Sequence, residues 1–158
     1  MSIPSVVRAF IFNQDWDVLL TKHKKDALWV LPWGHVESDE SLHDAMKREL
    51  QEEFWIDANF FEIDSEEILY HRGKKLLHFP APISIYELRY TNKNWEDKSR
   101  IEHIFLMETL DNIKTTQPEE ISEFKWFEID EVLSMKPNIE TFDFIIEMLE
   151  KIISEDDE

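Results

Sequence analysis

The stretch from Gly34 to Ile56, GHVESDESLHDAMKRELQEEFWI, constrains the fold of this chain more than any other. Its spacing predicts a helix over Ser41 to Phe54 whose apolar side chains fill one sector, namely Leu42, Ala45, Met46 and Leu50. On the same helical wheel Glu49 and Glu53 project into the middle of that sector, and Glu52 lies on its flank. The predicted helix therefore turns carboxylates toward a core.

Carboxylates that face a core must be paired, protonated or bound to a cation, because desolvating a lone charge is very costly. Arg48 can reach Glu52 one turn on, but one Arg does not neutralise three Glu side chains. Hard oxygen ligands on one helix face suit Mg²⁺ or Mn²⁺, which bind a few carboxylates together with substrate phosphates. We therefore expect a divalent metal site here. The alternative, a solvated amphipathic helix, would leave Glu49 and Glu53 on the wrong face.

The same residues resemble the signature of the Nudix hydrolase family. That signature reads Gly, five residues, Glu, seven residues, Arg-Glu, an aliphatic residue, any residue, Glu-Glu, any residue, Gly and an aliphatic residue. Its positions are filled here by Gly34, Glu40, Arg48, Glu49, Leu50, Glu52, Glu53 and Ile56. Chance would place the Gly and the charged residues at this spacing in roughly one in a million starts. Trp55 departs from the pattern, because it occupies the closing Gly position.

The resemblance implies a divalent-metal-dependent pyrophosphohydrolase that cleaves a nucleoside diphosphate linked to another moiety. Its substrates would include oxidised nucleoside triphosphates, dinucleoside polyphosphates and nucleotide sugars such as ADP-ribose. The resemblance also implies that Glu49, Glu52 and Glu53 bind the Mg²⁺ or Mn²⁺, with the carbonyl of Gly34 as a further ligand. It does not identify the residues that bind the nucleotide, and the oligomeric state stays open.

Further catalytic roles follow from the same resemblance. Glu52 and Glu53 act in catalysis with Arg48, which orients a ligand carboxylate, while Glu40 stabilises the loop and the helix. An acid from a distant loop often completes such sites, and Glu119 and Glu120 are the candidates; a surface role in a polar loop explains them equally well. The second functional class is a catalytically impaired Nudix-fold module that binds nucleotides or regulates. Such a module would have no reason to keep its buried carboxylates.

Strand patterns surround two helical ones along the chain. The expected strands are Ser5 to Asn13, Val18 to Lys22, Leu28 to Leu31, Glu67 to Tyr70, Leu76 to Phe79, Ile83 to Tyr90, Ile101 to Glu108 and Glu123 to Glu128. A second helix is expected over Ile139 to Ile153 with Asn138 as its cap, and Gly73 is expected to supply a positive φ in a hairpin turn. Periodicity alone gives an α/β or α+β class.

The family resemblance narrows the class to a Nudix-type α/β/α sandwich. A mixed β-sheet would lie between the signature helix and the C-terminal helix. We expect one hydrolase domain over residues 1–153 and an acidic, frayed tail over residues 154–158.

Composition excludes several functional classes. A formal charge of -18 argues against binding to a nucleic-acid backbone, and the absence of cysteine excludes disulfides and thiolate metal sites. No apolar run is long enough for a membrane span, and the N-terminus does not resemble a signal peptide, so we expect a cytoplasmic protein. A phosphorylated substrate would be repelled by so acidic a chain unless cations were bound first. The expected partner is a small-molecule nucleotide.

Glycine is scarce and tryptophan abundant: the chain has 2 Gly and 6 Trp, where average usage would give about eleven Gly. Trp16 and Trp95 lie in polar turns that favour Gly, and Trp33 and Trp55 lie where the family usually has Gly. We hypothesise that all four are Gly in the native protein, as would follow if the source reads UGA as glycine. The rival account is a genuine Trp-bearing variant. Strained backbone is expected at Trp33 and Trp55, because a positive φ disfavours Trp.

Overall fold

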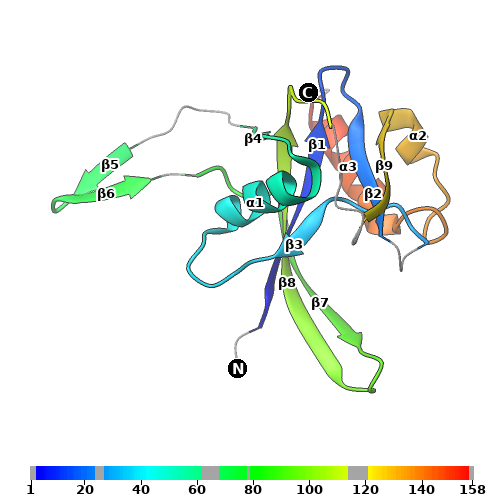
Figure 1. The fold of residues 1–158 in the computed structure, drawn as a ribbon, viewed down its shortest axis with the longest axis horizontal. Helices are drawn as coiled ribbons and strands as arrows, with labels where there is room; N and C mark the ends of the chain where they lie inside the picture. The colour runs from blue at the N-terminus through cyan, green and yellow to red at the C-terminus, as the bar shows by residue number, and fades with distance from the viewer. Residues whose placement is uncertain (1–2, 24–26, 62–67, 78, 114–120, 157–158) are drawn as a thin grey trace.

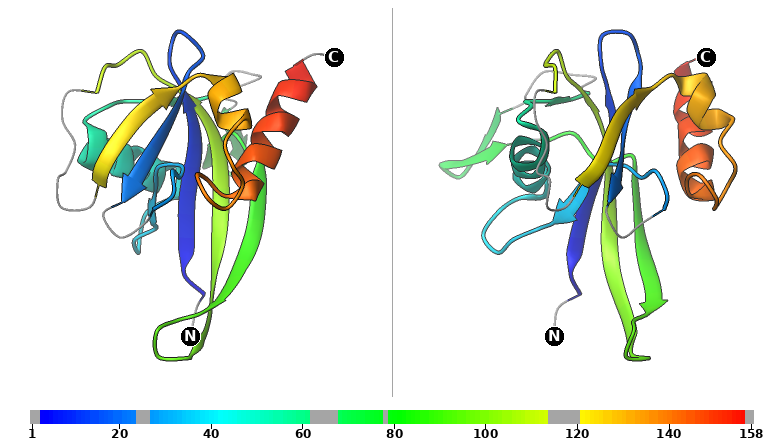
Figure 2. Two further views of the ribbon diagram at one scale, coloured as in Figure 1. Left: turned by 90° about the vertical axis from the view of Figure 1, so that its right-hand side faces the viewer. Right: turned by 45° about the vertical axis from the view of Figure 1, so that its right-hand side comes forward.

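A mixed β-sheet between two helices forms the body of the protein. The computed structural model describes residues 3–23, 27–61, 68–77, 79–113 and 121–156. Helix α1 (Leu42–Phe54) covers one face of the sheet, and helix α3 (Asp143–Asp156) covers the other, as Figures 1 and 2 show. The short helix α2 (Ile129–Leu133) packs against α3. The expected α/β/α sandwich is confirmed.

The seven strands of the main sheet run in the order β4-β8-β1-β2-β9, with β3 paired to β1 and β7 paired to β8. They are β1 (Ser5–Phe12), β2 (Val18–His23), β3 (Trp33–His35), β4 (Asn59–Phe60), β7 (Ser84–Thr91), β8 (Asp97–Glu108) and β9 (Ile121–Phe127). Only β1 and β8 pair in parallel within the described sheet. A two-stranded hairpin, β5 (Ile68–His71) and β6 (Lys74–Leu77), lies apart from this sheet (Figure 1).

The central strand β1 divides the apolar core into two clusters, because successive side chains of a strand point to opposite faces. Val7, Ala9 and Ile11 pack in the cluster that contains the buried face of α1. Phe10 and Phe12 pack in the cluster that contains α3. None of the described helices is long and apolar enough to cross a membrane.

The segment Leu28 to Leu31 is not a strand, contrary to expectation. Trp29 donates its backbone N–H to the carbonyl of Glu140 at 2.8 Å and accepts the Thr141 hydroxyl at 2.7 Å. Trp29 is thus bonded to the loop before α3, whereas Val30 forms an isolated bridge with Thr21 of β2 through two hydrogen bonds of 2.8 Å. The strand of this region follows Pro32 as β3. Short β4 and α2 were not expected, because two and five residues carry no readable periodicity.

Helix α3 starts later and ends later than its apolar pattern suggested. Asn138 has φ 61° and lies in a turn before the helix, where its Oδ1 accepts the N–H of Asp143 at 3.2 Å. The helix continues through Ser154 to Asp156, residues that were expected to belong to a frayed tail. Gly73, at φ 76°, supplies the positive φ of the β5–β6 turn, as expected.

Three of the four anomalous tryptophans have a left-handed backbone. Trp16, Trp55 and Trp95 have φ values of 63°, 57° and 61°. The expectation of strain at Trp55 is therefore confirmed. At Trp33 it is wrong, because this residue lies in β3 opposite Arg8 and has no positive φ.

Candidate active site

Helix α1 has well-defined ends that fix the direction of its acidic face. Ser41 caps its N-terminus, where the hydroxyl oxygen accepts the N–H of Asp44 at 3.0 Å. At the other end Trp55 adopts the left-handed conformation and donates its N–H to the carbonyl of Gln51 at 3.1 Å. Between these caps Ala45, Met46 and Leu50 are buried against the sheet, as predicted for the apolar sector, and the fourth predicted member, Leu42, is partly buried. Phe54 is buried with them.

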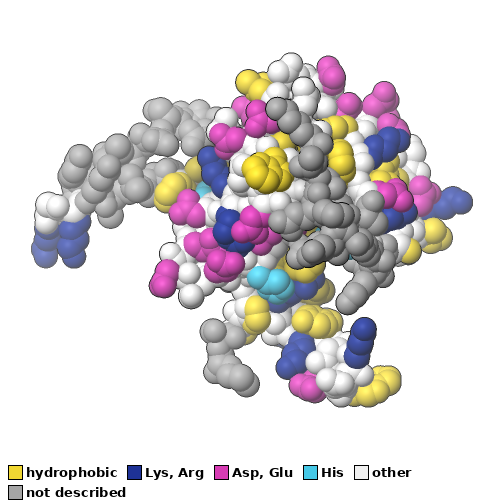
Figure 3. All heavy atoms as spheres, in the orientation of Figure 1, with side chains coloured by type: hydrophobic (Ala, Val, Ile, Leu, Met, Phe, Trp, Pro, Cys, Tyr) yellow, Lys and Arg dark blue, Asp and Glu magenta, His cyan; other side chains and the backbone are white. Residues whose placement is uncertain are grey.

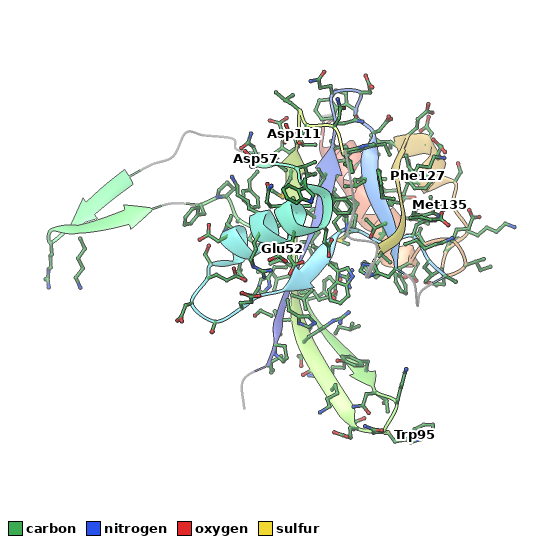
Figure 4. All side chains as sticks on the ribbon, viewed as in Figure 1. Glu52, Asp57, Trp95, Asp111, Phe127 and Met135 are labelled. Carbon is green, nitrogen blue, oxygen red and sulfur yellow. The ribbon has the colours of Figure 1, made fainter. Side chains whose placement is uncertain are left out.

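The carboxylates of α1 differ in burial in the way the helical wheel predicts. Glu53 is 3% exposed and lies on the buried face among the apolar residues. The Glu49 side chain is 14% exposed, and that of Glu52 is 50% exposed. Glu52 projects from α1 beside β3 (Figure 4), and acidic side chains gather over this helix in Figure 3. Two of the three carboxylates thus lie in a protein environment and not in bulk water.

Arg48 binds the carboxylates around it. Its Nη1 donates to Glu49 Oε1 at 3.0 Å and to Glu52 Oε2 at 3.2 Å. Its Nε and Nη2 donate to the two oxygens of Glu40 at 3.1 and 2.9 Å, and Nη2 also donates to the carbonyl of His35 at 3.0 Å. One guanidinium therefore ties the helix to the loop that precedes it.

Glu40 fixes that loop in turn. Its Oε1 accepts the backbone N–H of Glu37 at 2.8 Å, so one carboxylate joins Arg48 to the chain before the helix. The hydrogen bonds from Arg48 and from the Glu37 N–H hold the pKa of Glu40 below its usual range. The same contact with Glu40 raises the pKa of Arg48.

A glycine is required at position 34 because the Glu49 side chain approaches its Cα closely, and not because of its backbone dihedral angles. A Cβ atom built on Gly34 would overlap the side chain of Glu49, including its carboxylate. Strand β3 brings this Gly to α1 through its pairing with β1, where Gly34 lies opposite Val7. The signature Gly and Glu49, the first of the three expected metal ligands, are therefore in direct contact, and any larger residue at position 34 would displace Glu49.

The donor chemistry of this cluster suits a hard divalent cation, since it consists of carboxylate oxygens beside a backbone turn. Within the described ranges, no three His, Asp or Glu side chains converge at metal-ligand spacing. Arg48 instead engages two of the expected ligands, Glu49 and Glu52. The candidate acids Glu119 and Glu120 lie outside the described residues.

Comparison with known proteins decides the family. The family model described as NUDIX domain matches residues 3–146. The chain belongs to the Nudix family. It is accordingly a Nudix-type hydrolase, a class that acts on phosphoanhydride bonds. A search of curated protein sequences finds no match.

Solved Nudix structures share the whole fold at low identity. The MutT protein from Methanosarcina mazei Go1 is 20% identical with a TM-score of 0.67, covering 100% of this chain and 99% of its own. A NUDIX-family hydrolase from Clostridium perfringens is 21% identical with a TM-score of 0.68, covering 98% of each chain. The C. elegans Ap4A hydrolase is 17% identical with a TM-score of 0.63, covering 97% of this chain and 98% of its own.

This Nudix fold also contains a large cavity on the α3 face of the sheet. It has a volume of about 730 Å³, in the range of ligand-binding pockets, and Trp33 forms part of its wall. Its polar floor is formed by Arg8, Arg100 and Glu102, three residues that the sequence analysis did not single out. One signal was available, since Arg8 interrupts the otherwise apolar strand Val6 to Phe12.

Proposed function

We propose that this Nudix protein is a divalent-metal-dependent pyrophosphohydrolase that cleaves a nucleoside diphosphate linked to another moiety. The observation that carries the proposal is the buried acidic face of α1, where Glu53 is 3% exposed and Glu49 lies against Gly34. A helix does not retain such charges for stability alone, because their desolvation is costly. The substrate class comprises oxidised nucleoside triphosphates, dinucleoside polyphosphates and nucleotide sugars such as ADP-ribose.

Glu49, Glu52 and Glu53 are the residues proposed to hold Mg²⁺ or Mn²⁺, with the Gly34 carbonyl as a further ligand. When bound, the ion supplies charge neutralisation at the phosphates and lowers the pKa of water. Arg48 orients Glu49 and Glu52 through its Nη1, and Glu40 holds Arg48 in place. Glu120 stays a candidate for the additional acid.

We place this activity in the cytoplasm, on free nucleotides and not on nucleic acid, since a chain of charge -18 would repel a phosphate backbone. The unit that carries it is proposed to be one domain over residues 1–153. The second candidate, a non-catalytic nucleotide-binding or regulatory module, is disfavoured by the retention of all three buried or half-buried carboxylates.

Replacing one carboxylate tests the proposal. A nucleotide panel is incubated with Mg²⁺ or Mn²⁺, and phosphoanhydride cleavage is followed by chromatography. We expect Glu53→Gln to lower kcat by orders of magnitude without unfolding the chain, and chelator to abolish activity. Glu150→Gln, an exposed change on α3, is the matched control. Unchanged turnover in Glu53→Gln would contradict the metal assignment, and nucleotide binding without cleavage in the parent chain would favour the module.

A further inference from the structure

The floor of the α3-face cavity is a buried cluster of three charges. Arg8 donates from Nε and Nη2 to Glu102 Oε1 at 3.1 and 3.0 Å. Arg100 Nε lies 3.1 Å from the same carboxylate oxygen. The parallel pairing of β1 with β8 creates this cluster, because it brings residues 94 positions apart onto the same face of the sheet.

The charges of this cluster do not balance. Two guanidiniums share one carboxylate, and both Arg8 and Glu102 are nearly buried, with side-chain exposures of 8% and 2%. At the rim Lys151 and Glu147 offset each other. The described cavity lining therefore carries one excess positive charge in a chain whose formal charge is -18. A partly desolvated cation without a counter-charge is unfavourable, and an anion in the cavity would relieve it.

Arg100 keeps hydrogen-bonding capacity for such a ligand. Its side chain is 19% exposed and lines the cavity. Its Nε is buried against Glu102, so the donors available to a ligand are those of its two terminal Nη atoms. A guanidinium has five donors in a fork that matches the oxygens of phosphate or carboxylate. Arg8 and Arg100 both contact Glu102 at Oε1, so this one carboxylate oxygen lies between two cations.

The cavity adjoins the acidic face of α1 through β3. The guanidinium carbons of Arg8 and Arg100 lie 4.9 and 5.2 Å from the ring centroid of Trp33. Gly34, the next residue of β3, contacts Glu49 of α1. Consecutive strand residues point to opposite faces of a sheet. Trp33 therefore faces the cationic cavity, while the next residue, Gly34, faces the carboxylates of α1.

We propose that this cavity binds an oxyanion carried by the part of the substrate remote from the cleaved bond, and that Arg100 determines this specificity. Glu102 is a positioning residue that holds both guanidiniums. The description of the ligand as substrate rests on the proposed function, whereas the anion site itself does not. The preferred substrates are therefore nucleoside diphosphates whose second moiety carries its own phosphate or carboxylate.

Anion binding in chelator tests the site independently of hydrolysis. Inorganic pyrophosphate is titrated into the full chain by calorimetry with excess EDTA, so that the carboxylates of α1 hold no metal and repel the anion. We expect saturable binding that Arg100→Met weakens at least about tenfold, since charge-assisted hydrogen bonds are lost. Arg89→Met, which removes an arginine with a side chain 81% exposed on β7, should leave the affinity unchanged.

Further arms identify the ligand and guard against misfolding. Arg100→Lys keeps the charge but loses the fork, so we expect it to fold and to bind pyrophosphate with intermediate affinity. Malonate binding that also depends on Arg100 would extend the site to carboxylates, and binding of pyrophosphate alone would assign it to phosphate. Three outcomes would overturn the proposal. They are the absence of pyrophosphate binding, an equal pyrophosphate affinity in Arg100→Lys and wild type, and Arg100-dependent binding of neutral guanosine alone. Failure to hydrolyse any nucleotide would overturn only the proposed function.

Discussion

Trp16 and Trp95 occupy equivalent positions in two hairpin loops with the same hydrogen bonds. In the first loop the carbonyl of Asn13 accepts the N–H of Trp16 at 3.1 Å, and in the second that of Asn92 accepts the N–H of Trp95 at 3.1 Å. Each Asn also accepts two further backbone N–H groups through its Oδ1. A three-residue hairpin of this kind requires a left-handed residue at its end, which is the usual place of Gly.

The backbone at these tryptophans predicts a gain in stability on substitution by Gly. Trp95→Gly and Trp55→Gly should each raise the free energy of unfolding by about 1 kcal/mol, because strain is relieved and these exposed rings lose little packing. Trp95 lies at the tip of the β7–β8 hairpin in Figure 4. Urea denaturation measures the change in the free energy of unfolding. Trp29→Gly is a control that should destabilise the protein, since the ring of Trp29 packs edge-on to that of Phe127 with centroids 4.9 Å apart.

The origin of the tryptophans is a separate question that the gene decides. UGA codons at positions 16, 33, 55 and 95 would support recoding to glycine, whereas UGG codons there would end that hypothesis. Trp33 fits it less well on structural grounds, because its backbone is extended and its ring stacks with two guanidiniums.

At the scale of elements, the junction between α1 and its preceding loop depends on one cation. Arg48 joins Glu40, Glu49, Glu52 and the carbonyl of His35. If it is removed, like-charged side chains are left facing one another on the helix and the loop. The loop between β3 and α1 then loses the hydrogen bonds that Arg48 makes to Glu40 and to the carbonyl of His35.

This junction predicts a specific dependence of stability on pH. The folded pKa of Glu40 lies below its unfolded value, near 4.5, so its contribution to stability is present above that value and is lost as pH falls through the folded pKa. Arg48→Met should lower stability at pH 7 and flatten the fall on acidification. Urea midpoints between pH 7 and pH 3 measure both effects. A parallel acid profile in the variant would show that Arg48 does not set the pKa of Glu40.

A buried charge cluster lies where β1 pairs with β8. Burial alone would raise the pKa of Glu102, but Arg8 and Arg100 outweigh that effect and hold the pKa below its usual range. Glu102→Gln should cost about 3–5 kcal/mol of stability, because two partly buried guanidiniums lose their counter-charge. Chemical denaturation checks this value. Glu87→Gln, on the exposed face of β7, is the control and should change stability little.

At the scale of the whole molecule, the charge of -18 makes divalent cations a stabilising partner. If the α1 carboxylates bind Mg²⁺, folding gains about 2.7 kcal/mol at a concentration one hundred times the Kd. We expect thermal unfolding to shift upward with Mg²⁺ but not with equal ionic strength of Na⁺. Glu49→Gln combined with Glu53→Gln should remove the difference. An equal shift in that double variant would assign the effect to general screening.

Local sequence determined the parts of this protein whose hydrogen bonds close within a few residues. The extent of α1 and the inward direction of Glu49 and Glu53 follow from a period of 3.6 residues, and its N-cap follows from the hydroxyl of Ser41. The left-handed positions of Trp16, Trp55 and Trp95 likewise follow from turn and cap chemistry. Family resemblance then supplied the sandwich, because no local pattern distinguishes α/β from α+β.

Only the tertiary structure decided the contacts that join distant segments. The cluster of Arg8, Glu102 and Arg100 exists because β1 lies in parallel beside β8, a pairing that no spacing within either strand encodes. The segment Leu28 to Leu31 has an apolar strand composition, yet its backbone partners are divided between Thr21 of β2 and the loop before α3. Strand order, and the choice of which distant backbone groups hydrogen-bond to each other, are properties of the packed sheet. Short-range periodicity carries no information about either of them.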